Sequence, residues 1–173
     1  MKKWFLILLS LPVFLAACNK SDGVKCNYSD SPAIAPAIEI SNLENYLTVN
    51  SLPATADSIG AQRTGVFYNI SSPATGAKPN VCSNITVNYT GTLLSNGNVF
   101  DSNTSPSGIS FTLGQLILGW QKGLKHVNAG SQVTLYIPPS LAYGSTDRTD
   151  GSGNVIIPAN SYLKFEVNLK DVQ

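Results

Sequence analysis

The sequence predicts an α+β fold of five to six antiparallel strands and one short internal helix. Apolar and polar residues alternate along most of the chain after Arg63, which is the pattern of half-buried strands. The stretch from Trp120 to Val127 reads instead as a short helix closed by Gly130. Charged residues make up only 12% of the chain, about half of the usual share of roughly 25%, and this composition suits a β-rich secreted domain.

Residues 1–17 read as a signal peptide that is not part of the fold. Two lysines follow the initial Met, and residues 4–17 are apolar apart from Ser10. This run is shorter than the stretch of about 20 residues that a membrane span needs. Its basic start and short apolar centre are those of a signal peptide.

The predicted signal peptide ends in LAAC, residues 15–18, which resembles a bacterial lipobox. Cys18 would then become the lipidated N-terminus of the mature protein. Two or more acyl chains anchor a protein stably, at about 0.8 kcal/mol per buried CH₂. The alternative is an ordinary signal peptide with a Cys near its cleavage site. We therefore expect a lipid-anchored protein of the bacterial cell envelope, on the periplasmic face or at the outer membrane, and not a transmembrane protein.

With Cys18 lipidated, Cys26 and Cys82 remain as an even pair of cysteines, and export would place them in an oxidising compartment. They form either a disulfide that pins the N-terminal tail to the domain or two unrelated thiols, and the sequence does not choose. The three cysteines and the single His126 lack the spacing of metal ligands, so we expect no metal and no cofactor. Without residues 1–17 the formal net charge changes from +1 to about −1, and no basic patch supports binding to nucleic acid.

The chain divides into three predicted parts. Residues 1–17 are the signal peptide, residues 18–62 hold the lipidated N-terminus, a linker and a short helix, and residues 63–173 form the folded domain. The linker, residues 19–36, is polar and then rich in Pro and Ala. Residues 52–62 are expected to be a connection.

The short N-terminal helix is predicted over residues 38–49, with Ser41 or Asn42 as its N-cap. Four apolar residues of this stretch lie at the spacing of one helix face: Ile40, Leu43, Tyr46 and Leu47. The predicted strands that follow are residues 66–70, 84–94, 99–101, 109–113, 132–137 and 163–172. Residues 95–98 form a turn with Gly97 at positive φ, and the pair Pro138-Pro139 ends the strand before it.

Large apolar and aromatic residues gather beside the predicted turns. They are Phe100, Ile109, Phe111, Leu116, Ile117, Trp120, Tyr143, Ile156, Ile157 and Phe165. One carboxylate, Asp101, follows Phe100 directly. Side chains at the ends of elements converge on a concavity, although an aromatic cluster in a β-rich domain more often belongs to a closed core.

The chain resembles FKBP-type peptidyl-prolyl cis-trans isomerases in four successive segments, which read VNYTGTLLSNGNVFDSN, FTLGQLILGWQKGLKHVNAG, YIPPSLAYG and IIPANSYLKFEVNL. The resemblance covers about residues 65–172, in the correct order and nearly uninterrupted. Each segment alone has moderate specificity, and four in register are specific. The lipobox, linker and short helix resemble those of exported bacterial members of the family.

This resemblance implies a half-open antiparallel sheet wrapped on the short helix, with a proline-binding pocket between them. The catalytic residues that it implies are Phe100, Asp101, Trp120 and Tyr143, with the indole of Trp120 as the floor. The N–H of Ile117 and the hydroxyl of Tyr143 would each meet a ligand carbonyl. The other implied binding residues are Tyr89, Ile109, Phe111 and Phe165 in the walls, Leu116 and Ile117 at the rim, and Ile156 and Ile157 at the lip.

The implied activity is acceleration of X-Pro isomerisation in exported proteins, by non-covalent binding and without a cofactor. The implied partners are proline-containing segments of those proteins, a membrane reached through the lipid anchor, and macrolide-type inhibitors. The alternative is a non-catalytic FKBP-like module that binds peptides or acts as a chaperone. Retention of Asp101, Trp120 and Tyr143 together favours the enzyme.

Several residues depart from the family pattern or carry no chemistry. Ile109 stands where an aromatic residue is frequent, and the polar loop 145–155 lacks the His that some members have there. His126 is expected to cap the helix or to face solvent. Asp147 and Asp150 lie in a polar loop without the acidic ligands of a calcium site, so we expect a solvated turn.

Overall fold

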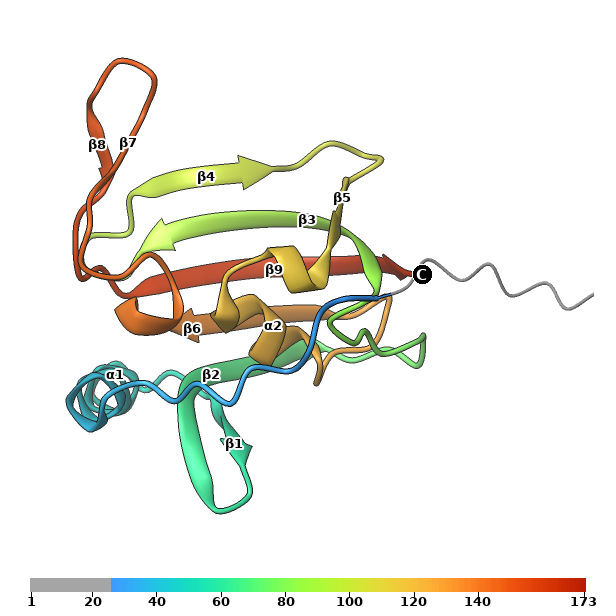
Figure 1. The fold of residues 1–173 in the computed structure, drawn as a ribbon, viewed down its shortest axis with the longest axis horizontal. Coiled ribbons are helices and arrows are strands. Elements are labelled where there is room, and N and C mark those ends of the chain that lie inside the picture. The colour runs from blue at the N-terminus through green and yellow to red at the C-terminus, as the bar shows by residue number, and fades with distance from the viewer. Residues whose placement is uncertain (1–25) are drawn as a thin grey trace, which may run out of the picture.

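The computed structural model describes residues 26–173, so the predicted signal peptide and Cys18 lie outside the described residues. The main sheet has seven strands in the order β1-β2-β6-β9-β3-β4, with β5 also paired to β3, and β7 and β8 form a separate hairpin (Figure 1). All pairings are antiparallel, and the predicted α+β class is confirmed. The elements are α1 Ala37–Val49, β1 Thr55–Ile59, β2 Gln62–Ser72, β3 Asn84–Leu93, β4 Val99–Asn103, β5 Ile109–Thr112, the 3-10 turn η1 Leu113–Gln115, α2 Leu118–Leu124, β6 Gln132–Ile137, the 3-10 turn η2 Pro139–Leu141, β7 Arg148–Thr149, β8 Val155–Ile157 and β9 Leu163–Val172.

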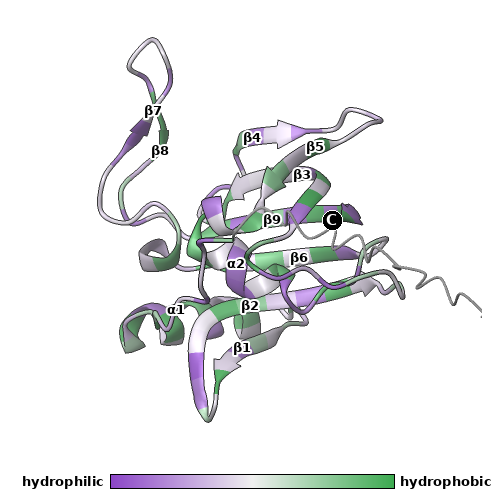
Figure 2. Cartoon of the chain, turned by 45° about the vertical axis from the view of Figure 1, so that its right-hand side comes forward, coloured by the Kyte–Doolittle hydropathy of each residue, from purple (hydrophilic) through white to green (hydrophobic). Residues whose placement is uncertain are grey.

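Helix α2 packs on one face of the sheet, and the main hydrophobic core lies between them. Gly119 and Gly123 face β6, where a Cβ at Gly123 would lie 2.6 Å from Cδ2 of Leu135 and a Cβ at Gly119 would overlap Ile137. Because these two positions have no side chain, the helix backbone can approach the strand closely. Hydrophobic and hydrophilic residues alternate along the strands, as expected for a sheet with one face packed on a core (Figure 2).

Helix α1 packs on the other face of the sheet. Its Leu43 and Leu47 form a second buried cluster with Phe67 of β2 and Tyr136 of β6. Phe67 and Tyr136 are each next in sequence to a residue of the main core. Because successive side chains of a strand point to opposite faces, these two point away from the main core. The predicted caps at Ser41 and Asn42 are wrong, because the N-cap is Pro36 and no side chain caps the helix. The hydroxyl of Ser41 instead donates to the carbonyl of Ala37 inside the helix, at 2.8 Å.

The predicted connection at residues 52–62 contains strand β1, which pairs with β2 in a hairpin. Gly60 turns the chain there with φ of 60°. The polar pair Asp57-Ser58 interrupts the apolar alternation of this strand, and this is why the sequence did not indicate it. The hairpin β7-β8 was also missed, because its loop is polar. The division of the chain at residues 17 and 62 stays a prediction.

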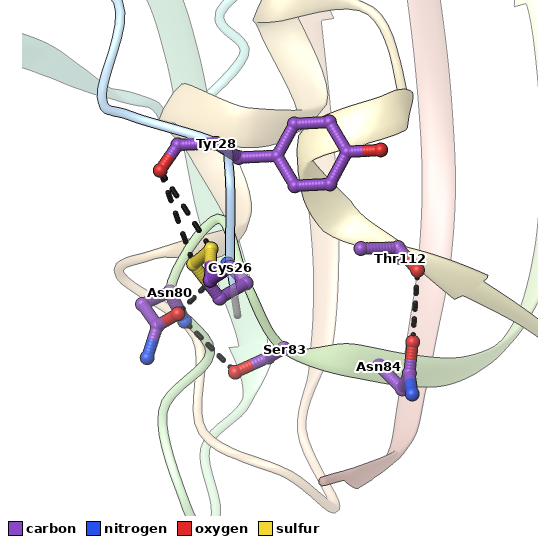
Figure 3. The surroundings of a disulfide bond; sticks show 7 residues. Cys26, Tyr28, Asn80, Ser83, Asn84 and Thr112 are labelled. Atoms are coloured by element: carbon purple, nitrogen blue, oxygen red, sulfur yellow. Dashed lines mark hydrogen bonds between the residues drawn. A yellow bond between two sulfur atoms is a disulfide. The ribbon is translucent and has the colours of Figure 1, made fainter. Parts of the chain in front are cut away.

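Residues 26–36 cross the domain as an extended segment, which we call the N-terminal strap. Cys26 at its start is joined to Cys82 by a disulfide, with Cα atoms 5.6 Å apart (Figure 3). The Tyr28 ring lies against Gly114, where a Cβ would lie 2.7 Å from Cδ1 of that ring. At the other end the N–H of Ala35 donates to Thr64 of β2 at 2.8 Å. This part of the predicted linker is therefore packed on the domain.

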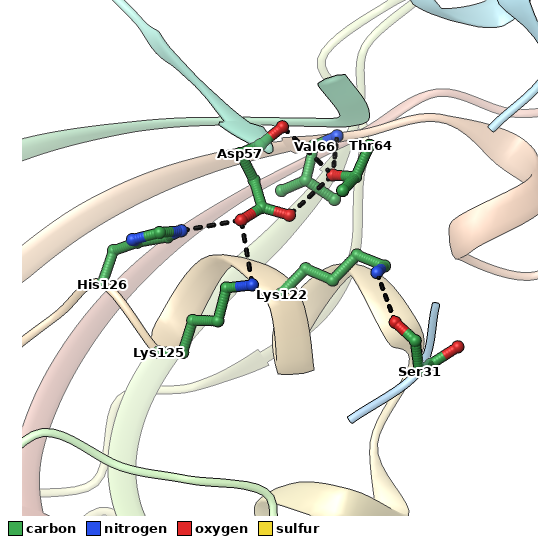
Figure 4. Close-up of polar contacts among 7 residues, drawn as sticks. All are labelled: Ser31, Asp57, Thr64, Val66, Lys122, Lys125 and His126. Atoms are coloured by element: carbon green, nitrogen blue, oxygen red, sulfur yellow. Dashed lines mark hydrogen bonds and ion pairs between the residues drawn. The ribbon is translucent and has the colours of Figure 1, made fainter. Parts of the chain in front are cut away.

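Buried Lys122 of α2 also holds the strap. Its Nζ donates to the carbonyl of Ser31 at 2.8 Å (Figure 4). Burial lowers the pKa of Lys122 because it penalises the charged form. Within residues 26–173 the structure has no helix with the length and hydropathy of a membrane span.

Candidate active site

A cleft of about 310 Å³ opens between the sheet, helix α2 and the chain that follows η2. It is lined by Tyr89, Asp101, Phe111, Gln115, Leu116, Ile117, Trp120, Tyr143 and Phe165. These residues come from β3, β4, β5, η1, α2 and β9 and from the loops after η1 and η2. The fold thus brings together side chains that are far apart in the sequence.

Trp120 in the first turn of α2 forms the bottom of the cleft. Only 4% of its surface is exposed. Two aromatic rings meet it edge to face, that of Tyr89 at a centroid distance of 5.4 Å and that of Phe165 at 5.3 Å. Such contacts fix the plane of the indole. Neighbouring Gly119 lets α2 lie close to β6, and the helix thereby brings the large side chain of Trp120 against the sheet.

Asp101 is the one carboxylate among the residues that line the cleft. Its Oδ2 accepts a hydrogen bond of 2.7 Å from the hydroxyl of Tyr89. Burial and this hydrogen bond both raise the pKa of Tyr89, so the phenol stays protonated and donates. The pair therefore places a fixed negative charge at the cleft wall, on an exposed side chain.

Tyr143 offers a second hydroxyl to the cleft. Burial raises the pKa of Tyr143, the negative charge of Asp101 raises it further, and the positive charge of Arg148 opposes them. The phenol is therefore neutral at physiological pH and able to donate a hydrogen bond to a carbonyl. Tyr143 follows the turn η2, which the predicted stop at Pro138-Pro139 introduces.

The rim of the cleft is braced from within α2. Nε2 of Gln121 donates to the carbonyl of Leu116 at 2.7 Å and to that of Gly114 at 3.2 Å. Ile117 is the N-cap of α2. No hydrogen bond within residues 26–173 engages the N–H of Ile117, and its contact with a ligand carbonyl stays a prediction.

Four residues implied by the resemblance do not line the cleft. The ring of Phe100 packs edge to face on Phe165 at 5.5 Å, behind the cleft wall. Ile109 pairs with Val87 and is half-buried on the core. Ile157 is buried, while 38% of Ile156 is exposed. The substrate-contacting roles of these four residues stay predictions.

Gln115 lines the cleft although the sequence reasoning did not single it out. A polar residue between Gly114 and Leu116, within an otherwise apolar rim, is the signal that would have found it. The cleft therefore holds one carboxylate and four uncharged side chains that can form hydrogen bonds, in mainly apolar surroundings: Tyr89, Gln115, Trp120 and Tyr143. Within residues 26–173 no group of three or more His, Cys, Asp or Glu side chains is placed to hold a metal.

His126 belongs to a separate polar cluster, and the prediction that it caps the helix or faces solvent is wrong. Its Nε2 lies 2.8 Å from Oδ1 of fully buried Asp57 (Figure 4). Its ring stacks on that of Tyr68 at a centroid distance of 4.5 Å. Nζ of Lys125 lies 3.1 Å from the same oxygen, and the hydroxyl of Thr64 donates to Oδ2 at 2.7 Å. Burial would raise the pKa of Asp57, but these hydrogen bonds and the charge of Lys125 lower it to about 2.

The family model for "FKBP-type peptidyl-prolyl cis-trans isomerase" matches residues 76–170. The chain belongs to this family. Every residue that lines the cleft falls inside the matched range. The predicted resemblance is thereby confirmed. The aromatic residues of the cluster belong partly to the main core and partly to the lining of the cleft, and their role in substrate binding stays a prediction.

Named relatives agree with this assignment. FkpA of Escherichia coli strain K12, an FKBP-type peptidyl-prolyl cis-trans isomerase, is 36% identical over 120 residues, which are 69% of this chain and 42% of the relative. FK506-binding protein 2 of Candida glabrata is 44% identical over 91 residues, 51% of this chain and 63% of the relative. A crystal structure of a peptidyl-prolyl cis-trans isomerase from Pseudomonas syringae pv. tomato has a TM-score of 0.62 and 25% identity, and covers 80% of this chain and 97% of that one.

The chain spans less than half of the length of the FkpA proteins that it matches. The alignment with the Pseudomonas syringae enzyme covers most of both chains. The FKBP-type domain and its fold are therefore shared with these proteins, while parts of FkpA have no counterpart in the matched region.

Proposed function

We propose that this FKBP-type protein is a peptidyl-prolyl cis-trans isomerase that accelerates rotation about X-Pro bonds in exported polypeptides. The observation that supports this most is the cleft itself, in which the Trp120 floor, the Tyr89–Asp101 pair and the Tyr143 hydroxyl face one apolar space. Isomerisation forms and breaks no covalent bond, so the residues needed are those that bind and polarise the substrate. The cleft has these.

Rotation about the amide bond has a barrier of about 18–20 kcal/mol because twisting breaks resonance, and the uncatalysed reaction takes tens to hundreds of seconds. A millionfold acceleration requires about 8 kcal/mol of differential stabilisation of the transition state. An apolar cleft disfavours the planar, strongly dipolar amide relative to the twisted amide, whose carbonyl and nitrogen carry less charge separation.

Each polar group has a proposed task in this reaction. The N–H of Ile117 and the hydroxyl of Tyr143 hold carbonyls of the chain that flanks the proline, and so fix one side while the bond turns. The carboxylate of Asp101 acts in this proposal on the twisting amide, and the hydroxyl of Tyr89, which donates to it at 2.7 Å, supports that role by orienting it. The face of Trp120 receives the proline ring.

Location and inhibitors are part of the same proposal. The LAAC sequence at residues 15–18 supports lipidation of Cys18 and attachment to the bacterial cell envelope. Radiolabelled fatty acid incorporated into the wild-type chain, and not into Cys18→Ala, tests it. The name of the Candida glabrata relative, FK506-binding protein 2, supports binding of macrolide-type inhibitors in the cleft.

The decisive experiment is measurement of cis/trans exchange in an X-Pro peptide with the wild-type chain, Trp120→Ala and Asp101→Ala. Fast exchange that falls in both variants is the expected result. Exchange at the uncatalysed rate, with the peptide still bound to the wild-type chain, would support instead the non-catalytic peptide-binding or chaperone module.

A further inference from the structure

Arg148 is placed to act on the cleft although it does not line it. It opens β7 in the hairpin that projects from the domain (Figures 1 and 2). Its Cζ lies 5.4 Å from the centroid of the Tyr143 ring, within the roughly 6 Å of a cation–π contact. The guanidinium therefore lies over the face of the Tyr143 ring, and Tyr143 is one of the two tyrosines that line the cleft.

The base of this hairpin is held in place. The N–H of Ala159 donates to Oδ1 of Asp147 at 2.6 Å, and the N–H of Asn160 donates to the carbonyl of Gly144 at 2.9 Å. Arg148 itself pairs with Ile157, which is 4% exposed and belongs to the main core. The backbone of Arg148 is thus tied to the domain at the point where its side chain reaches Tyr143.

The charges around the cleft are few. Asp101 is the one fully charged residue among those that line it. Within residues 26–173 no ion pair joins Arg148 to a carboxylate, and its side chain is exposed. Asp101 and Arg148 act on the Tyr143 hydroxyl with opposite sign. A polypeptide that extends out of the cleft past Tyr143 therefore moves away from the negative charge of Asp101 and meets the positive charge of Arg148.

We propose that Arg148 is a positioning and specificity-determining residue of the cleft, which holds the Tyr143 ring and selects polypeptides with an acidic side chain next to the proline. This inference rests on the proposed function of the cleft. Arginine suits the role because its planar guanidinium stacks on an aromatic face and still presents donors to a carboxylate. A lysine next to the proline is repelled by the same group.

The test uses the full chain and three variants at one position: Arg148→Gln, Arg148→Glu and Arg148→Lys. Arg63→Gln is the matched control, because Arg63 is also an exposed hairpin arginine and contacts Glu44 instead of the cleft. The substrates are peptides with Glu, Ala or Lys directly before the proline, and a second set with the same residues directly after it. The measured quantity is the ratio of kcat/KM for the Glu peptide to that for the Lys peptide.

The wild-type chain and Arg63→Gln are expected to prefer Glu over Lys about two- to fivefold at low salt, the factor typical of an exposed charge pair. Arg148→Gln brings the ratio to one or below it, because Asp101 is then the charge that remains in the cleft lining. Arg148→Glu reverses the ratio, and Arg148→Lys largely keeps it. Addition of 0.5 M salt shrinks the wild-type ratio, since exposed charges are then screened. A purely structural role of Arg148 would lower all rates together and leave the ratio unchanged.

The proposal is overturned if Arg148→Gln and Arg148→Glu retain the wild-type ratio for both peptide sets. If the wild-type chain accelerates none of the peptides, the proposed function fails separately. The same peptides are then titrated by calorimetry. A preference for Glu in affinity that Arg148→Glu reverses still supports the role of Arg148, and equal wild-type affinities for the Glu and Lys peptides overturn it.

Discussion

The hydroxyl of Tyr89 donates a hydrogen bond of 2.7 Å to Oδ2 of Asp101, across two paired strands. This contact fixes the carboxylate at the cleft wall, while the Tyr89 ring meets that of Trp120 edge to face. One residue thus orients both the charged and the aromatic side of the cleft. Its two contributions can be separated by experiment.

Tyr89→Phe keeps the ring and removes the hydroxyl. We expect kcat/KM for an X-Pro peptide to fall about three- to tenfold, the loss of about 1 kcal/mol that one hydrogen bond contributes. The unfolding free energy is expected to change little, because Asp101 is exposed and becomes hydrated. Tyr162→Phe is the control, since Tyr162 contacts Asn42 outside the cleft, and an equal loss of rate there would contradict the role of the Tyr89 hydroxyl.

Gly119→Ala tests the close packing of α2 on the sheet. The added Cβ would lie 2.6 Å from Cδ1 of fully buried Ile137, and overpacking of this kind costs about 1–3 kcal/mol. We expect urea unfolding to show this loss and the exchange rate to fall, because Trp120 moves with the helix. Gly151→Ala has open space around its Cβ, and both measured quantities should stay at their wild-type values in that variant.

Asp57 links stability to acid pH. The folded-state pKa of about 2 lies below the ordinary value of 3.8, so the carboxylate stabilises the fold above pH 4. This contribution is lost as the pH falls from about 4 to about 2. The shift corresponds to about 2 kcal/mol of unfolding free energy.

Asp57→Asn leaves Lys125 and His126 without their carboxylate and is expected to lower the unfolding free energy at pH 7 by about 2–4 kcal/mol. Urea unfolding at pH 7, 4 and 2.5 measures this, and the difference between wild type and variant should shrink toward pH 2.5. Asp171→Asn removes an exposed carboxylate and serves as control. A difference that is constant over this pH range would contradict the assigned role of Asp57.

The disulfide between Cys26 and Cys82 closes a loop with a sequence separation of 56 residues. Chain entropy alone gives such a bridge about 4 kcal/mol, so reductant is expected to lower the urea midpoint of the wild-type chain. The double variant Cys26→Ser, Cys82→Ser should unfold at that lower midpoint with or without reductant. Identical wild-type midpoints under both conditions would mean that the two residues are separate thiols.

Local sequence patterns predicted the strands where alternation is unbroken. Residues 132–137 and 163–172 match β6 and β9. They also predicted α1, but placed its cap at Ser41 or Asn42 instead of Pro36, because a polar side chain that lies within a helix looks the same in sequence as one that caps it. Strand β1 was missed because its central Asp57 is buried together with its partners instead of following the apolar pattern.

The sequence by itself determined the fold class, the family and most of the residues that line the cleft, because these depend on short motifs whose order and spacing are local. Tertiary structure decided which of the implied residues reach the cleft, and it set Phe100 behind Phe165. It also paired His126 with Asp57, 69 residues away, and laid Arg148 over Tyr143. These contacts depend on how distant strands and loops pack together, and side-chain periodicity carries no information about such distances.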